Sequence, residues 1–362
     1  MYKLHILLIS IILAFVIIMV PSKISSVLYN NNNINSTHAL PLHLHAANNN
    51  LDGNASSSNY SKKYPPTVKL ENSTLSYNSI NGLHLNLSKP VLQVVASFFP
   101  IYEFVKAVGG ERVQASVLIP IGSEPHDFDP TIQEISNAQN ADMVVYNGAG
   151  MESVWINKVN PKFAVDTSQG LNLPLNNDKE AITGIDPHIW LDPILAEHQV
   201  NTIRDGLINI DPNNANYYKS NAQKFNTQLA SLDSTIKAGL SSCNKKDFIS
   251  FHNAFTYFAK RYGLTQHAIQ GLSPEGEILP QKIQDIIQLA NKLGINIIYS
   301  EDLIDPRGVQ IIADEIPNGK VLILSPIEGI KPTEQQAGIG YLDKMKQDLA
   351  NLEVGLQCKS SN

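Results

Sequence analysis

The feature that most constrains the fold is a long helical stretch in the middle of the chain. Residues 213–240 contain no Pro, and their only Gly is Gly239. Their apolar residues recur at intervals of three and four, which places them on one face of a helix. A helix of this length spans about 42 Å, roughly the width of a small domain. The stretch therefore predicts a strut that joins two lobes.

Short apolar runs alternate with helical segments on both sides of this stretch. Before it, we expect strands at 91–97, 113–119 and 143–146, and helices at 101–108 and 131–139, the second with Asp129 as N-cap and Pro130 at N1. After it, we expect strands at 248–251, 295–300 and 321–324, and helices at 254–262, 280–293 and 309–315. Such alternation favours parallel sheets with helical crossovers. The predicted fold is α/β, with two lobes, each a mainly parallel sheet flanked by helices, joined by one long rigid helix.

The first ninety residues differ from the rest in composition. Residues 6–20 are apolar apart from Ser10, which predicts a signal peptide or signal anchor over 1–23 and an exported chain. No Cys follows this run, so a bacterial-type lipid anchor on Cys is not expected. Residues 24–90 are rich in Asn and predict a disordered stalk, because they cannot bury enough apolar surface to offset their conformational entropy. We expect the protein at the outer face of the cell membrane, either anchored or released by cleavage.

Overall composition limits the classes of function. Hydrophobic residues make up 43% of the chain, enough for a packed core. The formal net charge is −6, and this field opposes phosphate backbones, so nucleic acid is not an expected partner. Two cysteines exclude a Cys-rich zinc module. We divide the folded part into an N-terminal lobe over 91–212, the linker helix over 213–240 and a C-terminal lobe over 241–362.

Candidate metal ligands lie close to the ends of predicted strands. His126 and His252 each come after a strand, His188 lies in a loop rich in turn-forming residues, and Asp305 follows the strand at 295–300. Ligands bind at the carboxyl ends of strands in open α/β sheets. Each residue also has a structural interpretation: a lone loop His is usually a hydrogen-bonded structural residue, and Asp305 before Pro306 is typical of a helix start.

The phrases around these residues resemble the metal-binding solute-binding proteins of zinc and manganese ABC importers. His126 stands in a glycine-containing turn before a Pro-initiated helix, and the phrase Asp-Pro-His-Ile-Trp-Leu-Asp-Pro at 186–193 is complete. His252 leads into an aromatic-containing helix, and Asp305 lies four residues after Glu301. The resemblance extends from about residue 94 to residue 357.

This resemblance implies capture of a metal ion rather than catalysis. His126 and His188 of the first lobe and His252 and Asp305 of the second would bind zinc between the lobes and deliver it to the permease of an ABC importer. A His at the third position favours zinc, with manganese less expected. Glu124, Asp127 and Asp192 are candidates to orient the imidazoles, and Glu301 could stabilise the site or replace Asp305. The protein is expected to be a monomer.

Several alternatives remain at this stage. The same fold could carry manganese or iron, or act as a surface adhesin with a structural metal. A zinc hydrolase is a third possibility, although four protein ligands would leave no position for water. Zinc members often have a His-rich loop between the first two ligands, and here residues 169–184 contain no His. A role for such a loop in collecting metal is therefore not expected.

The two cysteines fall in the second half of the chain. Cys243 and Cys358 are the only ones present, and an exported protein with one such pair is a candidate for a disulfide. The bridge would tie the C-terminus to the strand that precedes His252. Two free thiols are the alternative.

Overall fold

The computed structural model describes residues 91–175 and 184–359. The signal segment predicted at 1–23 and the stalk predicted at 24–90 lie outside these ranges. Within them, no helix combines the length and the apolar character needed to cross a membrane.

The N-terminal lobe is built on a parallel sheet of four strands in the order β2-β1-β3-β4. The strands are β1 (Leu92–Ala96), β2 (Val113–Val117), β3 (Met143–Tyr146) and β4 (Ala164–Asp166). The chain leaves β1 to form β2 on one side and then returns to form β3 on the other. In such sheets a ligand usually binds at the carboxyl ends of the strands where the direction changes, which here are β1 and β3.

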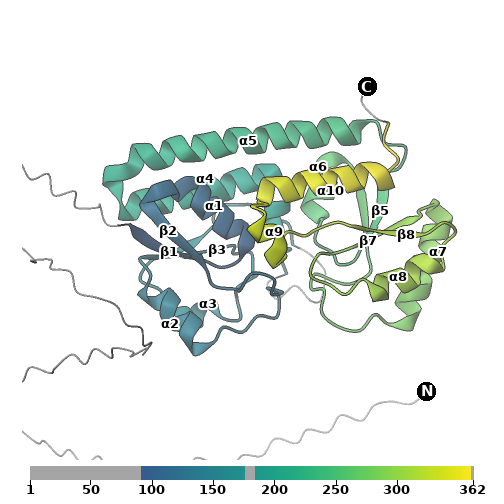
Figure 1. Cartoon of the computed structure of the whole chain (residues 1–362), viewed down its shortest axis with the longest axis horizontal. Helices are drawn as coiled ribbons and strands as arrows, with labels where there is room; N and C mark the ends of the chain where they lie inside the picture. Colours follow the sequence, from purple (N-terminus) through teal and green to yellow (C-terminus); the bar gives the residue numbers. More distant parts are fainter. Residues whose placement is uncertain (1–90, 176–183, 360–362) are drawn as a thin grey trace, which may run out of the picture. The chain divides into compact units, whose positions relative to one another are not determined.

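Helices flank both faces of this sheet. They are α1 (Phe99–Gly109), α2 (Ile132–Asn140), α3 (Ile156–Val159) and α4 (Pro193–Ile210). Figure 1 shows α1 and α4 on one side of the sheet and α2 and α3 on the other. The start of α2 corrects the prediction of Asp129 as N-cap, because Thr131 caps the helix and exchanges hydrogen bonds with Glu134. That reciprocal capping box satisfies backbone donors that Asp129 would have left unpaired.

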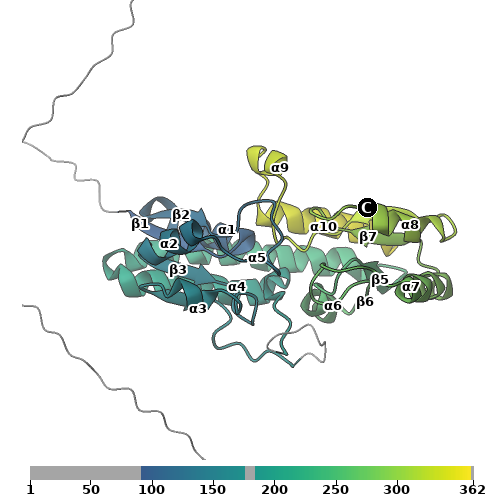
Figure 2. The ribbon, with the colours of Figure 1, turned by 90° about the horizontal axis from the view of Figure 1, so that it is seen from below.

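The predicted long helix is α5 (Ala215–Ser241). A short 3-10 turn, η4 (Pro212–Asn214), precedes it, so the helix begins two residues later than expected. Figure 1 and Figure 2 show α5 running beside α4 and then beside α10 (Tyr341–Gly355), the last helix of the chain. Its buried residues include Tyr218 and Leu229 and recur along one face. This face packs against elements from both halves of the chain.

The C-terminal lobe repeats the arrangement of the first. Its parallel sheet has the order β6-β5-β7-β8, with β5 (Asp247–Ser250), β6 (Thr265–Ala268), β7 (Ile297–Ser300) and β8 (Lys320–Ile323). The remaining helices are α6 (Thr256–Tyr262), α7 (Pro280–Leu293), α8 (Arg307–Asp314) and α9 (Pro332–Gln336). Gly263 and Gly294 end α6 and α7 in the left-handed conformation that favours glycine. The two-lobe α/β prediction is confirmed.

The hydrophobic core does not divide where the predicted domains do. One cluster of buried side chains runs from β1 across α5 to α10, including Val95, Leu229 and Leu352. A second, smaller cluster lies under α7 and α8 and includes Ile286 and Val309. Since one continuous core includes residues on both sides of the predicted boundaries at 213 and 241, these lobe boundaries remain a proposal.

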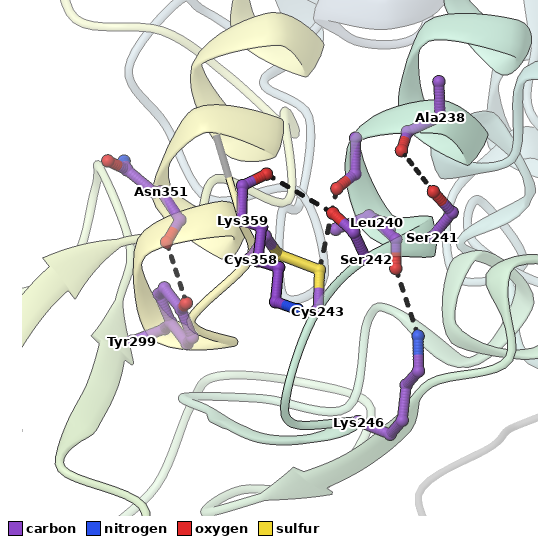
Figure 3. Close-up of a disulfide and its surroundings, with 11 residues drawn as sticks. Ala238, Leu240, Ser241, Ser242, Cys243, Lys246, Tyr299, Asn351, Cys358 and Lys359 are labelled. Carbon is purple, nitrogen blue, oxygen red and sulfur yellow. Dashed lines mark hydrogen bonds between the residues drawn. A yellow bond between two sulfur atoms is a disulfide. The ribbon is translucent and has the colours of Figure 1, made fainter. Parts of the chain in front are cut away.

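A disulfide joins Cys243, just after α5, to Cys358, just after α10. Figure 3 shows the bridge beside a hydrogen bond from the Ser242 hydroxyl to the Lys359 carbonyl. The same view shows the Tyr299 hydroxyl of β7 donating to the Asn351 carbonyl of α10. The end of the described chain is therefore fastened to the segment that leads into β5.

Candidate metal centre

Four side chains from four separate loops meet at the facing ends of the two sheets. His126 lies between β2 and α2, and His188 lies just before the 3-10 turn η3 (Ile189–Leu191). His252 follows β5, and Glu328 follows β8. Within the described residues these four form the one group of His, Cys, Asp or Glu side chains arranged to hold a metal ion.

Five of the six distances between the ligand atoms are close to those of a tetrahedral metal site, and all six lie within 4.8 Å. Oε1 of Glu328 lies 3.0, 3.1 and 3.4 Å from the Nε2 atoms of His126, His188 and His252. Nε2 of His188 lies 3.2 Å from Nε2 of His126 and 3.2 Å from Nε2 of His252. Zinc bonds to nitrogen and oxygen of about 2.05 Å in a tetrahedron place neighbouring ligand atoms about 3.3 Å apart. One ion at the centre would reach all four atoms.

Burial closes the site to water on most sides. His188 and His252 are fully buried, and Glu328 is 3% exposed. The side chain of His126 keeps 9% exposure, the largest of the four. A buried carboxylate beside three imidazoles is costly unless a cation compensates it, so the group is suited to a cation.

Carboxylates hold two of the imidazoles in the tautomer that a metal requires. Asp186 Oδ1 lies 2.7 Å from Nδ1 of His188, and Glu301 Oε1 lies 2.6 Å from Nδ1 of His252. The same oxygens also accept the backbone N–H groups of the two histidines. An Nδ1–H that donates to a carboxylate leaves the lone pair of Nε2 free for coordination. Asp186 and Glu301 therefore orient His188 and His252.

A buried network of amides supports the His188 loop from the N-terminal lobe. The Nδ2 group of Asn147 donates to the Pro187 carbonyl at 2.9 Å. Gln199 donates to Oδ1 of Asn147 at 2.9 Å and to Oγ1 of Thr167 at 2.8 Å. All three polar side chains of this network are fully buried. Since Asn147 directly follows β3, the sheet itself positions the loop.

The segment at 186–193 also links the two lobes. Nε1 of Trp190 donates to the Pro326 carbonyl at 2.7 Å, and the Tyr341 hydroxyl donates to the Trp190 carbonyl at 2.6 Å. On its other side, the Tyr257 hydroxyl of α6 donates to the Asp186 carbonyl at 2.8 Å. His188 thus lies on a segment that residues of the C-terminal lobe hydrogen-bond on both sides of it, at Asp186 and at Trp190.

Electrostatics favour a positive charge at the centre of the group. Burial disfavours protonated His252, but the Glu301 and Glu328 carboxylates outweigh it and raise the pKa of His252 well above its ordinary value. Burial would raise the pKa of Glu328, yet the charges of His252 and His126 lower that pKa well below its usual range. Burial, followed by the Glu328 charge, raises the pKa of Glu124 to about 9. Without metal, protons supply the positive charge, so a metal ion must displace them.

Of the four predicted ligands, the structure brings three together and leaves the fourth outside the group. His126, His188 and His252 converge, whereas Asp305 lies outside the group. The Asp305 carboxylate is exposed, accepts the backbone N–H of Arg307 and pairs with its guanidinium. It lies at the start of α8, which accounts for it without a metal.

Glu328 takes the place predicted for Asp305. It follows β8, so the rule that strand ends carry ligands, applied to the predicted strand at 321–324, would have pointed to it. Among the predicted orienting residues, Glu301 contacts His252, and Glu124 accepts the backbone N–H of His126. Asp192 instead caps α4 and pairs with Arg261. The contact of Asp186 with His188 was not predicted.

Comparison with known proteins agrees with this geometry. Residues 94–355 match the family of the zinc-uptake complex component A periplasmic, ZnuA. The high-affinity zinc uptake system protein ZnuA of Bacillus subtilis (strain 168) is 34% identical over 285 residues, which cover 74% of this chain and 89% of that protein. The zinc-binding protein AdcA of Streptococcus pyogenes is longer: a 32% identical match covers 74% of this chain and 56% of AdcA.

Solved structures share the fold. The Zn(II)-bound ZnuA-like domain of Streptococcus pneumoniae AdcA superposes with a TM-score of 0.65 at 31% identity, covering 74% of this chain and 99% of that one. The laminin binding protein Lmb of Streptococcus agalactiae, described as a bifunctional protein with adhesin and metal transporting activity, gives a TM-score of 0.67 at 29% identity, covering 74% and 100%. The resemblance drawn from the sequence is confirmed, and the chain belongs to the ZnuA family of zinc-uptake components.

Proposed function

We propose that this protein captures zinc outside the cytoplasmic membrane and delivers it to an ABC importer. The observation that carries the proposal is the set of four ligand atoms, three Nε2 and one Oε1, at the spacing of a tetrahedral site. The zinc-binding relatives and the zinc-uptake family support it. The ion is cargo, so binding must be reversible.

The donor set favours zinc over manganese or iron. Zinc accepts three imidazoles and one carboxylate in a tetrahedron. Manganese prefers oxygen donors in larger, octahedral shells, and the four side chains offer a single carboxylate. Affinity order alone would also allow copper or nickel, so a competition experiment has to test selectivity.

Capture takes place between the lobes. The N-terminal lobe supplies His126 and His188, and the C-terminal lobe supplies His252 and Glu328, so an ion gains its full ligand set only when the lobes are apposed. The helix α5 packs on both lobes and resists a wide hinge motion. Lower pH should weaken binding, because an imidazole must lose its proton before it coordinates.

The remaining parts of the proposal concern activity, partners and location. Four protein ligands fill a tetrahedron and leave no position for an attacking water, which favours a binding protein over a hydrolase. We propose that a monomer, with no nucleic-acid partner, meets the permease through surfaces of both lobes. The apolar run at 6–20 would hold the chain at the membrane or direct its export.

A metal competition experiment tests the proposal. The full chain is stripped with chelator and dialysed against equimolar zinc and manganese, and the bound metal is measured. We expect one zinc per chain. Retention of manganese instead would change the cargo, and no bound metal would refute capture.

Single substitutions test the ligand set. His126→Ala, His252→Ala and Glu328→Gln should each lose zinc. Asp305→Asn is the matched control and should bind zinc like the parent, because Asp305 is exposed and pairs with Arg307. Loss of zinc in Asp305→Asn with retention in Glu328→Gln would restore the ligand set first predicted from the sequence.

Reversibility separates transport from a structural metal. A transport protein should remain folded when chelator removes zinc and should bind it again. Irreversible unfolding on chelation would favour the adhesin alternative, in which the metal only stabilises the fold.

A further inference from the structure

The turn that carries Glu328 contains an unusual backbone conformation. After β8 ends, the chain passes through Ser325 and Pro326 to Ile327, which has a φ of 58°. Such positive values suit glycine, whereas for a β-branched residue they bring Cβ against the backbone and mark an outlier. Ile327 is also fully buried. Strain of this kind persists only where the surroundings impose it, and it gathers at functional sites.

Besides the bond from Trp190 to the Pro326 carbonyl, two buried hydrogen bonds hold this turn. Oγ of Ser325 accepts the backbone N–H of Ile327 at 3.2 Å. The backbone N–H of Ser325 donates in turn to Oδ1 of Asp348, on α10, at 2.7 Å. Ser325 is 1% exposed and Asp348 4%, so bulk water cannot readily replace either contact. The packing of α10 therefore fixes Ser325, and the Ser325 hydroxyl holds Ile327.

The conformation of Ile327 decides where the next side chain points. Glu328 is the following residue, and its Oε1 is the atom that reaches the Nε2 atoms of all three histidines. Rotation of Ile327 into the extended region would turn the following peptide and carry the carboxylate away from the imidazoles. The position of this ligand thus depends on a conformation that its own residue does not control.

We propose that Ser325 is a positioning residue for the metal ligand Glu328. Its hydroxyl keeps Ile327 in the left-handed conformation, and that conformation directs the Glu328 carboxylate at the divalent cation. This inference rests on the proposed function, because it assumes that Glu328 binds the captured metal.

The first test compares three substitutions of serine in the full chain. Zinc affinity is measured by competition with a chromogenic chelator. Ser325→Ala should weaken binding by about tenfold or more, the usual effect of removing a group that orients a ligand. Ser325→Thr keeps the hydroxyl and should restore most of the affinity. Ser234→Ala, on the exposed side of α5, is the matched control and should bind like the parent.

The second test asks whether the hydroxyl acts through Ile327. Glycine adopts positive φ without a steric penalty, so it does not need the hydroxyl to hold it. In the Ser325→Ala background, Ile327→Gly should therefore recover zinc affinity, even though the loss of a buried side chain lowers the melting temperature. Ile327→Asn provides the same comparison if the glycine variant does not fold, because Asn tolerates the left-handed region.

A cobalt spectrum reports on the ligand set directly. The parent loaded with Co²⁺ should show the intense visible bands of a four-coordinate ion. At a Co²⁺ concentration high enough to load the weakened variants, Ser325→Ala should shift toward the spectrum of Glu328→Gln, and a general loss of stability would not produce that shift.

The outcomes separate the two proposals. If the parent binds no zinc, the proposed function fails. If the parent binds zinc and Glu328→Gln does not, the function stands, and Ser325→Ala with parental affinity overturns the positioning role. The positioning role would also be overturned if Ser325→Ala binds zinc weakly and neither Ile327→Gly nor Ile327→Asn restores the affinity. The Ser325 hydroxyl would then not act through the backbone conformation of Ile327.

Discussion

In the N-terminal lobe, uncharged amides hold the segment that carries His188, whereas in the C-terminal lobe a buried ion pair holds the segment around Glu301. Asn147 and Gln199 form the first support through neutral hydrogen bonds. The second centres on Lys344 of α10, whose Nζ lies 2.7 Å from Oδ2 of Asp302, the residue after Glu301.

The difference shows that the two lobes can hold their parts of one candidate metal centre by different interactions, neutral hydrogen bonds in one lobe and an ion pair in the other. Removing a neutral hydrogen bond costs a modest desolvation penalty, whereas removing one partner of a buried ion pair leaves an uncompensated charge. We therefore expect substitutions in the C-terminal support to affect stability most, and substitutions of the neutral amides in the N-terminal support to act mainly on metal binding.

Lys344→Met should have the largest effect. Lys344 is 2% exposed, and its loss leaves the Asp302 carboxylate, whose side chain is 6% exposed, without its cation; Lys344 also pairs with the partly exposed Glu334 of α9 at 3.1 Å. We expect a loss of about 4 kcal/mol in the free energy of unfolding, measured by chemical denaturation. Lys346→Met is the control: its 3.8 Å pair with Asp343 is exposed, and the change should cost little. Equal losses in both variants would remove the distinction between the supports.

Removing the disulfide should come next. Cys243 and Cys358 are 115 residues apart in sequence, and the bridge restricts the unfolded chain over that loop. A variant with both cysteines changed to Ser should lose about 3 to 4 kcal/mol of unfolding free energy. Zinc affinity should stay near that of the parent, since the bridge lies after the C-terminal end of α5 and contacts none of the four candidate ligands. Reduction without loss of stability would show that the bridge does not support the fold.

Glu152 makes the N-terminal support sensitive to pH. It accepts the backbone N–H groups of Asn147 and Gly148, and burial raises its pKa to about 7. The folded state then binds more protons than the unfolded state between about pH 4.5 and 7, so stability falls as pH rises through this window. Relative to Glu152→Gln, the zinc-free parent should lose about 3 kcal/mol of unfolding free energy between about pH 4.5 and pH 7.

Denaturant titrations of both proteins from pH 4 to pH 8 provide the measurement. The difference between them isolates Glu152, because the histidines titrate in both. A difference that does not change with pH would mean that Glu152 stays ionised in the folded protein.

Asn147→Ala should have the smallest effect on stability and a clear effect on metal binding. It removes the donor to the Pro187 carbonyl next to His188. We expect zinc affinity to fall about tenfold, as for other groups that orient a ligand. Asn221→Ala removes a similar amide donor, to the Val108 carbonyl far from the site, and serves as the control. If both variants bind zinc alike, the amide network supports the fold and not the ligand.

Much of the fold follows from local patterns. The strand at 143–146 and the long helix were predicted within two residues, because strand and helix periods are properties of neighbouring residues. The N-cap of α2 was missed, because Asp129-Pro130 and Thr131 with Glu134 are both acceptable starts and tertiary packing decides between them. Much of the metal site followed in the same way, since three histidines stand close to strand ends.

The fourth member of the candidate centre could not be predicted in this way. Asp305 and Glu328 both follow strands of the second sheet, and their spacing in the sequence does not say which of them faces the first sheet. The strand order β6-β5-β7-β8, together with the turn at Ile327, brings Glu328 to the histidines and leaves Asp305 exposed.

The sequence by itself determined the alternation of strands and helices, the long helix between the lobes, three histidines of the candidate metal centre and the pair of cysteines. Each of these depends on short-range periodicity or on residue type. Only the tertiary structure decided the fourth member of the candidate centre and the groups that orient its histidines. Those depend on distances of about 3 Å between side chains up to 202 positions apart, as for His126 and Glu328. Such distances are set by sheet order and helix packing, which no local pattern encodes.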